Sequence, residues 1–105
     1  MDMEKTRNQT IRWYAMVAIN SGRPEPVAEP LVLSAIQSIP LECTARELRR
    51  ELDYLAHRGL VTIKRLEGAP WLIDLTRYGV DVIEYTVECD PGIARPKKYW
   101  CIGNE

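Results

Sequence analysis

The chain has 105 residues, of which 46% are hydrophobic and 28% charged, and its formal net charge is −1 at pH 7. This length predicts a single domain over 1–105, with its core in about 4–87 and an irregular tail over 88–105. The slightly acidic balance argues against a protein whose whole surface binds nucleic acid, since such proteins are usually basic. No apolar run approaches the roughly 20 residues of a membrane span, and the first ten residues are too polar for a signal peptide, so we expect no membrane contact.

Cysteine and histidine usage argues against a metal site. Cys43, Cys89 and Cys101 are widely spaced, no C-x-x-C pair occurs, and His57 is the single histidine. A structural zinc site usually takes four such ligands in close pairs, so we expect no metal and no cofactor. Unpaired thiols favour a reducing cytoplasm. The chain has neither a G-x-S-x-G motif nor a phosphate-binding loop, and we therefore expect no catalytic residues and no enzyme activity.

Two helices are predicted in the first forty residues. The first spans residues 4–20 and ends at Ser21-Gly22. Its apolar stripe at helical spacing comprises Ile11, Tyr14, Ala15, Ala18 and Ile19. After the connector RPEPVAEP, Pro30 suits the first position of a second helix, which Pro40 ends. Residues 41–43 could then pair briefly as a short strand.

A third helix and a β-hairpin are predicted next. Thr44 and Glu47 are spaced as a capping box at the start of the helix, and Gly59 ends it. The face predicted to be buried consists of Ala45, Leu48, Leu52 and Leu55. Residues 60–65 alternate in polarity, the turn LEGAP reverses the chain, and residues 71–75 return as the second strand.

A final helix is predicted from Arg77 to about Val87, with Thr76 as its cap. The sequence after it, which ends in CDPGIARPKKYWCIGNE, has no clear period and is predicted to be irregular. We expect Trp100 and Ile102 in this tail to fold back onto the domain, since free tails rarely keep such residues exposed.

Four stretches resemble known families. ELRRELDYLAHRGLV resembles the third helix of winged helix-turn-helix domains, and LTRYGVDVIEY resembles the segment that follows the hairpin in MarR-like and PadR-like regulators. RPEP and DPGIARPKKYW are similar to small winged-helix proteins of Mu-like bacteriophages and prophages. The resemblance implies an α+β winged helix-turn-helix fold of three helices, a two-stranded hairpin called the wing, and a C-terminal helix. It also implies a cytoplasmic protein of phage or prophage origin.

Positive charge is concentrated in residues 44–65, which have six basic and three acidic residues, whereas the rest of the chain is net acidic. Arg46, Arg50, Asp53 and His57 lie opposite the leucine face of the third helix, with Arg49 at the edge. The resemblance implies that this helix reads bases in the DNA major groove, while the wing contacts the flanking phosphate backbone. The predicted DNA-contacting set is Thr44, Arg46, Arg49, Arg50, His57, Lys64 and Arg65.

Two functions remain open at this stage. The first is a DNA-binding transcriptional regulator, which could be a homodimer that reads two half-sites. The second is a protein-interaction module in a phage assembly or host-takeover complex, because a charged helix face is often only solvated and internally paired. A DNA binder should show a continuous positive surface. An interaction module should show that surface broken by Glu47, Asp53 and Glu67, with an exposed apolar patch around Trp13 or Trp100.

Overall fold

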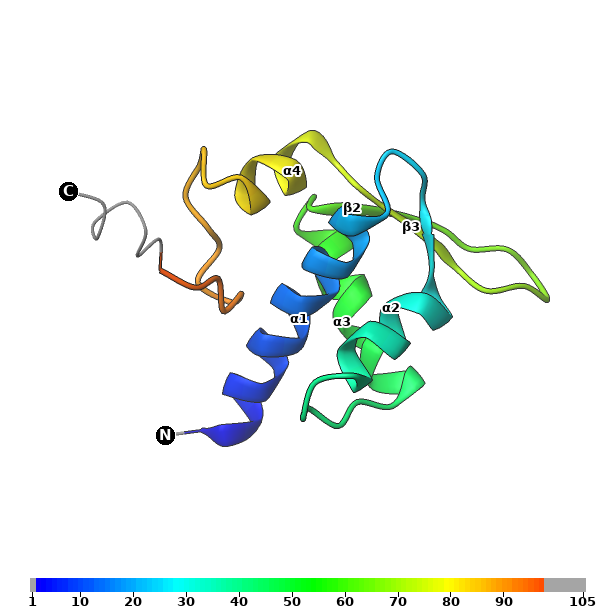
Figure 1. The fold of residues 1–105 in the computed structure, drawn as a ribbon, viewed down its shortest axis with the longest axis horizontal. Helices are drawn as coiled ribbons and strands as arrows, with labels where there is room; N and C mark the ends of the chain where they lie inside the picture. The colour runs from blue at the N-terminus through cyan, green and yellow to red at the C-terminus, as the bar shows by residue number, and fades with distance from the viewer. Residues whose placement is uncertain (1, 98–105) are drawn as a thin grey trace.

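The computed structural model of this chain describes residues 2–97. Four helices and a three-stranded sheet make up this part, and Figure 1 shows α1 passing in front of α3 while the hairpin loop extends away from the helices. The elements are α1 (Met3–Ser21), β1 (Val27–Ala28), α2 (Glu29–Gln37), α3 (Ala45–His57), β2 (Val61–Lys64), β3 (Leu72–Leu75) and α4 (Arg77–Ile83).

A single apolar core lies between α1, α2, α3 and the sheet. Its most completely buried side chains include Ile11, Ile19, Val32, Ile36, Leu48, Leu52, Leu55, Leu60, Ile73 and Val82. The predicted leucine face of α3 is therefore confirmed at three of its four positions. Ala45 is exposed, because at the first turn of α3 it lines a surface groove instead of the core. The prediction that Tyr14 belongs to the buried stripe of α1 is also wrong, since Tyr14 is 39% exposed.

The sheet has the order β1-β3-β2 and is antiparallel throughout. Its third strand is Val27–Ala28, in the proline-rich connector, and the strand predicted at residues 41–43 does not form. Val27 is buried opposite Ile73, and the Glu29 N–H extends the pairing by donating to the Trp71 carbonyl at 2.9 Å. An edge strand tolerates nearby prolines, since its outer side needs no backbone donors.

The last helix ends earlier than predicted, and the tail packs onto the domain. α4 stops at Ile83, and Tyr85 then takes a positive φ of 63°, which ends any helix there. Residues 88–97 contain no helix or strand, as predicted, but Ile93 is buried in the core. The Ala94 N–H donates to the Gln9 carbonyl at 3.1 Å, so this segment lies against α1. Trp100 and Ile102 lie outside the described residues.

Candidate nucleic-acid interface

The start of α3 is held by a capping box and by an arginine from α1. Thr44 Oγ1 accepts from the Glu47 N–H at 3.1 Å, and Glu47 Oε1 accepts from the Thr44 N–H at 3.0 Å, which confirms the predicted cap. The Arg7 guanidinium donates to both oxygens of Glu47, each at 2.9 Å. These hydrogen bonds, first from Arg7 and then from the Thr44 backbone, lower the pKa of Glu47 to about 2. The Thr44 hydroxyl is therefore used as the N-cap of α3, where it accepts the hydrogen bond from Glu47.

The lowered pKa predicts that acid destabilises the protein partly through Glu47. A carboxylate whose folded pKa is depressed adds stability above its ordinary pKa of 4.5, and this is lost as the pH falls towards 2. We expect Glu47→Gln to lower the free energy of unfolding at neutral pH by about 1–2 kcal/mol, because the pair is partly exposed and screened. The Gln variant should also lose less stability between about pH 5 and 3 than the wild type, as measured by urea unfolding. Identical pH profiles for both proteins would contradict this, and Glu67→Gln on the exposed hairpin loop is the control.

The free face of α3 carries the cations that have the fewest hydrogen-bond and ion-pair partners within the protein. Arg46, Arg50 and His57 are exposed on this face, opposite the leucines. Arg50 donates to Glu51 Oε2 at 3.1 Å, but Arg12 holds the other oxygen of the same carboxylate at 2.7 Å, so one of the two positive charges stays uncompensated. Within residues 2–97, the side chains of Arg46 and His57 have no hydrogen bond or ion pair, and the same is true of Lys64 at the end of β2.

Arg49 and Arg65, by contrast, fasten the hairpin to the helices. Arg49 forms a bidentate ion pair with Glu29 at 2.5 and 2.7 Å, and its guanidinium lies over the Trp71 ring at 4.4 Å. Arg65 pairs with Asp53 of α3 and also lies over Trp71, at 4.7 Å. Cation–π contacts of this kind add to the ion pairs. The hydrogen bonds from Arg49 and the Trp71 N–H lower the pKa of the buried Glu29 carboxyl.

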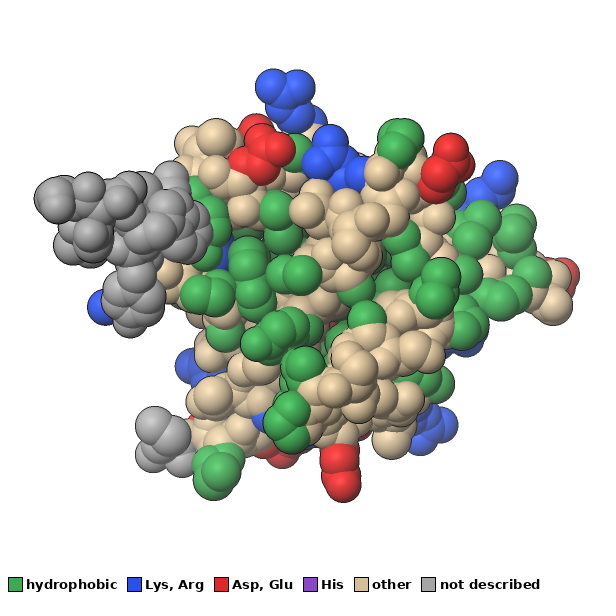
Figure 2. All heavy atoms as spheres, viewed as in Figure 1, with side chains coloured by type: hydrophobic (Ala, Val, Ile, Leu, Met, Phe, Trp, Pro, Cys, Tyr) green, Lys and Arg blue, Asp and Glu red, His purple; other side chains and the backbone are tan. Residues whose placement is uncertain are grey.

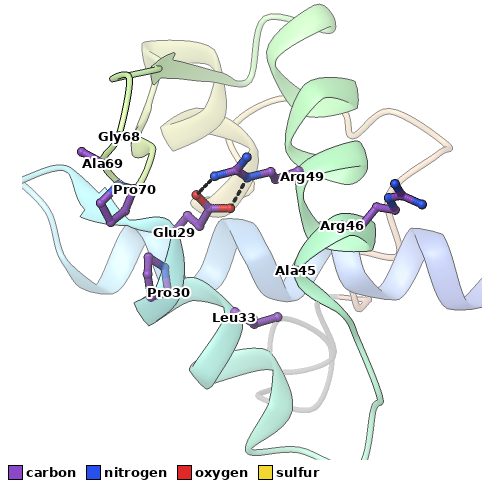
Figure 3. A pocket seen from close by; sticks show the side chains of 9 residues that line it. All are labelled: Glu29, Pro30, Leu33, Ala45, Arg46, Arg49, Gly68, Ala69 and Pro70. Carbon is purple, nitrogen blue, oxygen red and sulfur yellow. Dashed lines mark hydrogen bonds and ion pairs between the residues drawn. The ribbon is translucent and has the colours of Figure 1, made fainter.

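A groove of about 700 Å³ separates the starts of α2 and α3 from the hairpin loop. Figure 3 shows the Glu29–Arg49 pair across it, with Arg46 pointing away from that pair. Its remaining walls are largely apolar, formed by Pro30, Leu33, Ala45, Gly68, Ala69 and Pro70. The cations around this groove are therefore of two kinds, paired ones that hold the hairpin and unpaired ones that face solvent.

Other kinds of site receive no support from the described residues. In residues 2–97, no group of three His, Cys, Asp or Glu side chains could hold a metal ion. No helix in that range is long and apolar enough to cross a membrane. Cys43 and Cys89 are both free thiols whose pKa is raised, mainly by burial.

Solved structures share this architecture. The sequence matches no protein-family model and no curated protein. The ferric uptake regulator Fur of Vibrio cholerae matches with a TM-score of 0.52 and 12% identity, over 75% of this chain and 80% of Fur. PadR of Bacillus subtilis, solved with p-coumaric acid, matches with a TM-score of 0.50 and 13% identity, over 90% of this chain and 52% of PadR. The chain has a winged-helix fold. It spans about half the length of PadR, and at these identities the likeness concerns the fold alone.

In this winged helix, the β2–β3 hairpin is the wing, as predicted, and β1 adds a strand that the sequence analysis missed. The predicted contact residues are exposed but differ in their partners. Arg46, Arg50 and His57 share the free face of α3, whereas Arg49 and Arg65, although about half exposed, form ion pairs with Glu29 and Asp53. Asp53 is paired with Arg65 of the wing and not with an arginine of α3.

Two buried carboxylates that were not predicted from the sequence organise this region. Glu29 and Glu51 are 6% and 1% exposed, and each receives one or more arginines. For Glu51 a signal existed, because it lies beside Leu48, Leu52 and Leu55 on the apolar side of α3, where a charge requires a partner. Glu29 has no comparable signal, since it stands alone at the end of the connector.

Proposed function

We propose that this winged helix binds double-stranded DNA and regulates transcription, with α3 in the major groove and the wing against the backbone. The observation that supports this most is the charge left on the free face of α3. Arg65 neutralises Asp53, the one carboxylate of that face, while Arg46, Lys64 and one charge of the Arg12–Arg50 pair remain uncompensated. Such cations are what phosphate and guanine recognition needs.

The ion pairs assign different roles to the predicted contact residues. Arg46 and Arg50 are proposed to contact DNA directly, and Lys64 to contact the phosphate backbone from the wing. Arg49 and Arg65 are proposed as positioning residues that set the angle between the wing and α3, since their guanidinium groups are occupied by Glu29 and Asp53. His57 is exposed at the end of α3 and could add a contact there.

Three uncompensated cations predict weak binding with a moderate salt dependence. Each phosphate contact adds about −0.9 to the slope of log affinity against log salt, so we expect a slope near −2.7 per protomer. The affinity for duplex DNA should then fall about 40-fold between roughly 50 and 200 mM salt. Fluorescence anisotropy of a labelled duplex, titrated at several salt concentrations, measures this slope.

Arg46→Ala tests the residue assignment, because Arg46 has no internal partner to lose. We expect a weaker affinity and a slope that is less steep by about 1, with an unchanged thermal melt. Arg77→Ala is the matched control, since this arginine of α4 is 90% exposed and lies outside the proposed surface. An equal loss in both variants would mean that only overall charge matters.

The alternative is a winged helix that binds a protein instead of DNA. The largely apolar walls of the groove beside the wing favour it, as does the exposed Glu67 in the wing loop. Wild-type protein that fails to bind duplex DNA at about 50 mM salt would reject the first proposal and leave this one.

Further parts of the proposal come from the sequence resemblance. They are a homodimer, a cytoplasmic location and an origin in a phage or prophage. Identifying the genes next to the coding sequence tests the origin directly, because phage genes would surround it in a prophage.

A further inference from the structure

The outer faces of α1 and α2 form a surface without charged residues. Its solvent-accessible residues are Thr6, Thr10, Tyr14, Val17, Ser21, Leu31, Ser34, Ala35 and Ser38, which we call the uncharged face. In a chain with 28% charged residues, two neighbouring helices normally expose several of them. Figure 2 views the molecule from the side of α1 and shows hydrophobic side chains towards the centre, with most charged ones near the edge.

The uncharged face has both protruding apolar side chains and a notch. Leu31, Tyr14 and Val17 are 65%, 39% and 39% exposed, which makes them the most exposed large apolar side chains of α1 and α2 apart from Met3 near the chain start. Beside Leu31, a notch of about 210 Å³ lies in the seam between the two helices. It is lined by Ala18, Ser21, Gly22, Val27, Leu31 and Ala35. This is smaller than the roughly 300 Å³ of small-molecule sites, but it has room for a side chain.

We propose that the uncharged face is the interface with a second copy of this chain, related by a two-fold axis. In such an interface each residue near the axis meets its own copy, so a charge there would face its like. The uncharged face avoids this conflict. Nucleic acid and membrane surfaces are bound through basic residues, which this face lacks. An exposed apolar side chain of one copy, such as Leu31, would fill the notch of the second copy. By symmetry, the same side chain of the second copy would fill the notch of the first.

This interface leaves the proposed DNA-binding surface open. Arg12 points from α1 towards α3, where it binds Glu51 at 2.7 Å. At 3.6 residues per turn, Tyr14 and Val17 lie about 160° and 140° around α1 from Arg12. The uncharged face is therefore on the side of α1 away from α3. The interface rests on the homodimer part of the proposed function and names the surface that would form it. Self-association is measured without DNA, so its failure can be told apart from a failure of DNA binding.

The size of the face predicts a weak dimer. Each helix is about 10 Å across, and the face runs about 22 Å along α1 from Thr6 to Ser21 and about 11 Å along α2 from Leu31 to Ser38, which gives roughly 330 Å². This is below the roughly 600–1,000 Å² per partner of stable specific complexes and falls in the range of weak, transient contacts. We therefore expect association that depends on concentration, with a Kd of about 10–100 μM.

Sedimentation equilibrium of the full chain without DNA tests the proposal. The wild type should shift from monomer to dimer over about 5–500 μM. Tyr14→Glu and Leu31→Glu each place a charge in the face, and both should weaken association at least tenfold. Tyr78→Glu is the matched control, because Tyr78 on α4 is 40% exposed and lies outside the face.

Circular dichroism melts of each variant report whether the fold is kept, and Leu31→Glu provides a second test at a site that is more exposed. A wild type that stays monomeric over the whole range would overturn the proposal, and so would folded Tyr14→Glu and Leu31→Glu variants that associate as strongly as the wild type. An equal loss of association in Tyr78→Glu would overturn it as well.

Discussion

Replacing Glu51 with alanine is expected to lower the free energy of unfolding by about 3–5 kcal/mol, a large part of the 5–15 kcal/mol typical of a domain. The Glu51 carboxylate is 1% exposed and lies between the guanidinium groups of Arg12 and Arg50. Arg12 is itself only 16% exposed, and it lies over the Tyr54 ring at 3.6 Å. Removing the carboxylate would leave the Arg12 charge buried without its partner, which costs more than the pair itself contributes.

Urea unfolding followed by circular dichroism measures this loss. Glu67→Ala, in the exposed wing loop, is the control and should change the free energy of unfolding by less than about 0.5 kcal/mol. Glu51→Gln should fall between wild type and Glu51→Ala, because the amide keeps the shape of the side chain but loses its charge. A loss below about 1 kcal/mol in Glu51→Ala would show that solvent reaches Arg12 easily.

The second large effect is expected for Gly79→Ala in the first turn of α4. A Cβ atom at this position would lie 2.2 Å from the Leu60 carbonyl oxygen and 3.2 Å from a methyl carbon of Leu75. The first of these atoms belongs to the backbone, which cannot move aside as a flexible side chain can. We expect a loss of about 3 kcal/mol, the upper part of the range for overpacking, and a melting temperature lower by about 15 °C.

Gly68→Ala separates this close contact from backbone strain. Gly68 in the wing has a φ of +73° and no atom within 4 Å of the added Cβ, so alanine should cost only about 1 kcal/mol there. Equal losses in the two variants would mean that α4 moves away from Leu60 without penalty. The glycine of the segment LTRYGVDVIEY thus has a physical role, because it allows α4 to approach the chain at Leu60.

Local signals predicted the elements well. The capping box at Thr44, the stop before Gly59 and the leucine spacing of α3 act within one or two turns, and each is confirmed. The errors lie where contacts with a segment distant in the sequence determine the secondary structure or the burial of a residue. Val27 becomes a strand because β3 pairs with it, and Tyr14 stays exposed although its spacing matches its buried neighbours.

The candidate site was harder to predict than the fold, because its charges pair over long distances in the sequence. Glu29 and Arg49 are 20 residues apart, and Arg7 and Glu47 are 40 apart. Nothing in the local pattern distinguishes the paired Arg49 from the unpaired Arg46. The apolar patch that the interaction-module alternative required around Trp13 or Trp100 is not found at Trp13, which is 9% exposed and contacts Tyr85, and Trp100 lies outside the described residues.

The docking of residues 88–97 onto α1 also constrains the order of folding. Gly92 accepts from Arg12 at 2.8 Å, and the Ala94 N–H donates to Gln9, so a segment synthesised late completes the surroundings of the helix synthesised first. Closing a loop of about 80 residues carries an entropic cost that local contacts must offset before this junction forms. During synthesis, α1 can pack on α2 and α3 first, but its contacts with Gly92 and Ala94 form only after nearly all of the described chain has emerged.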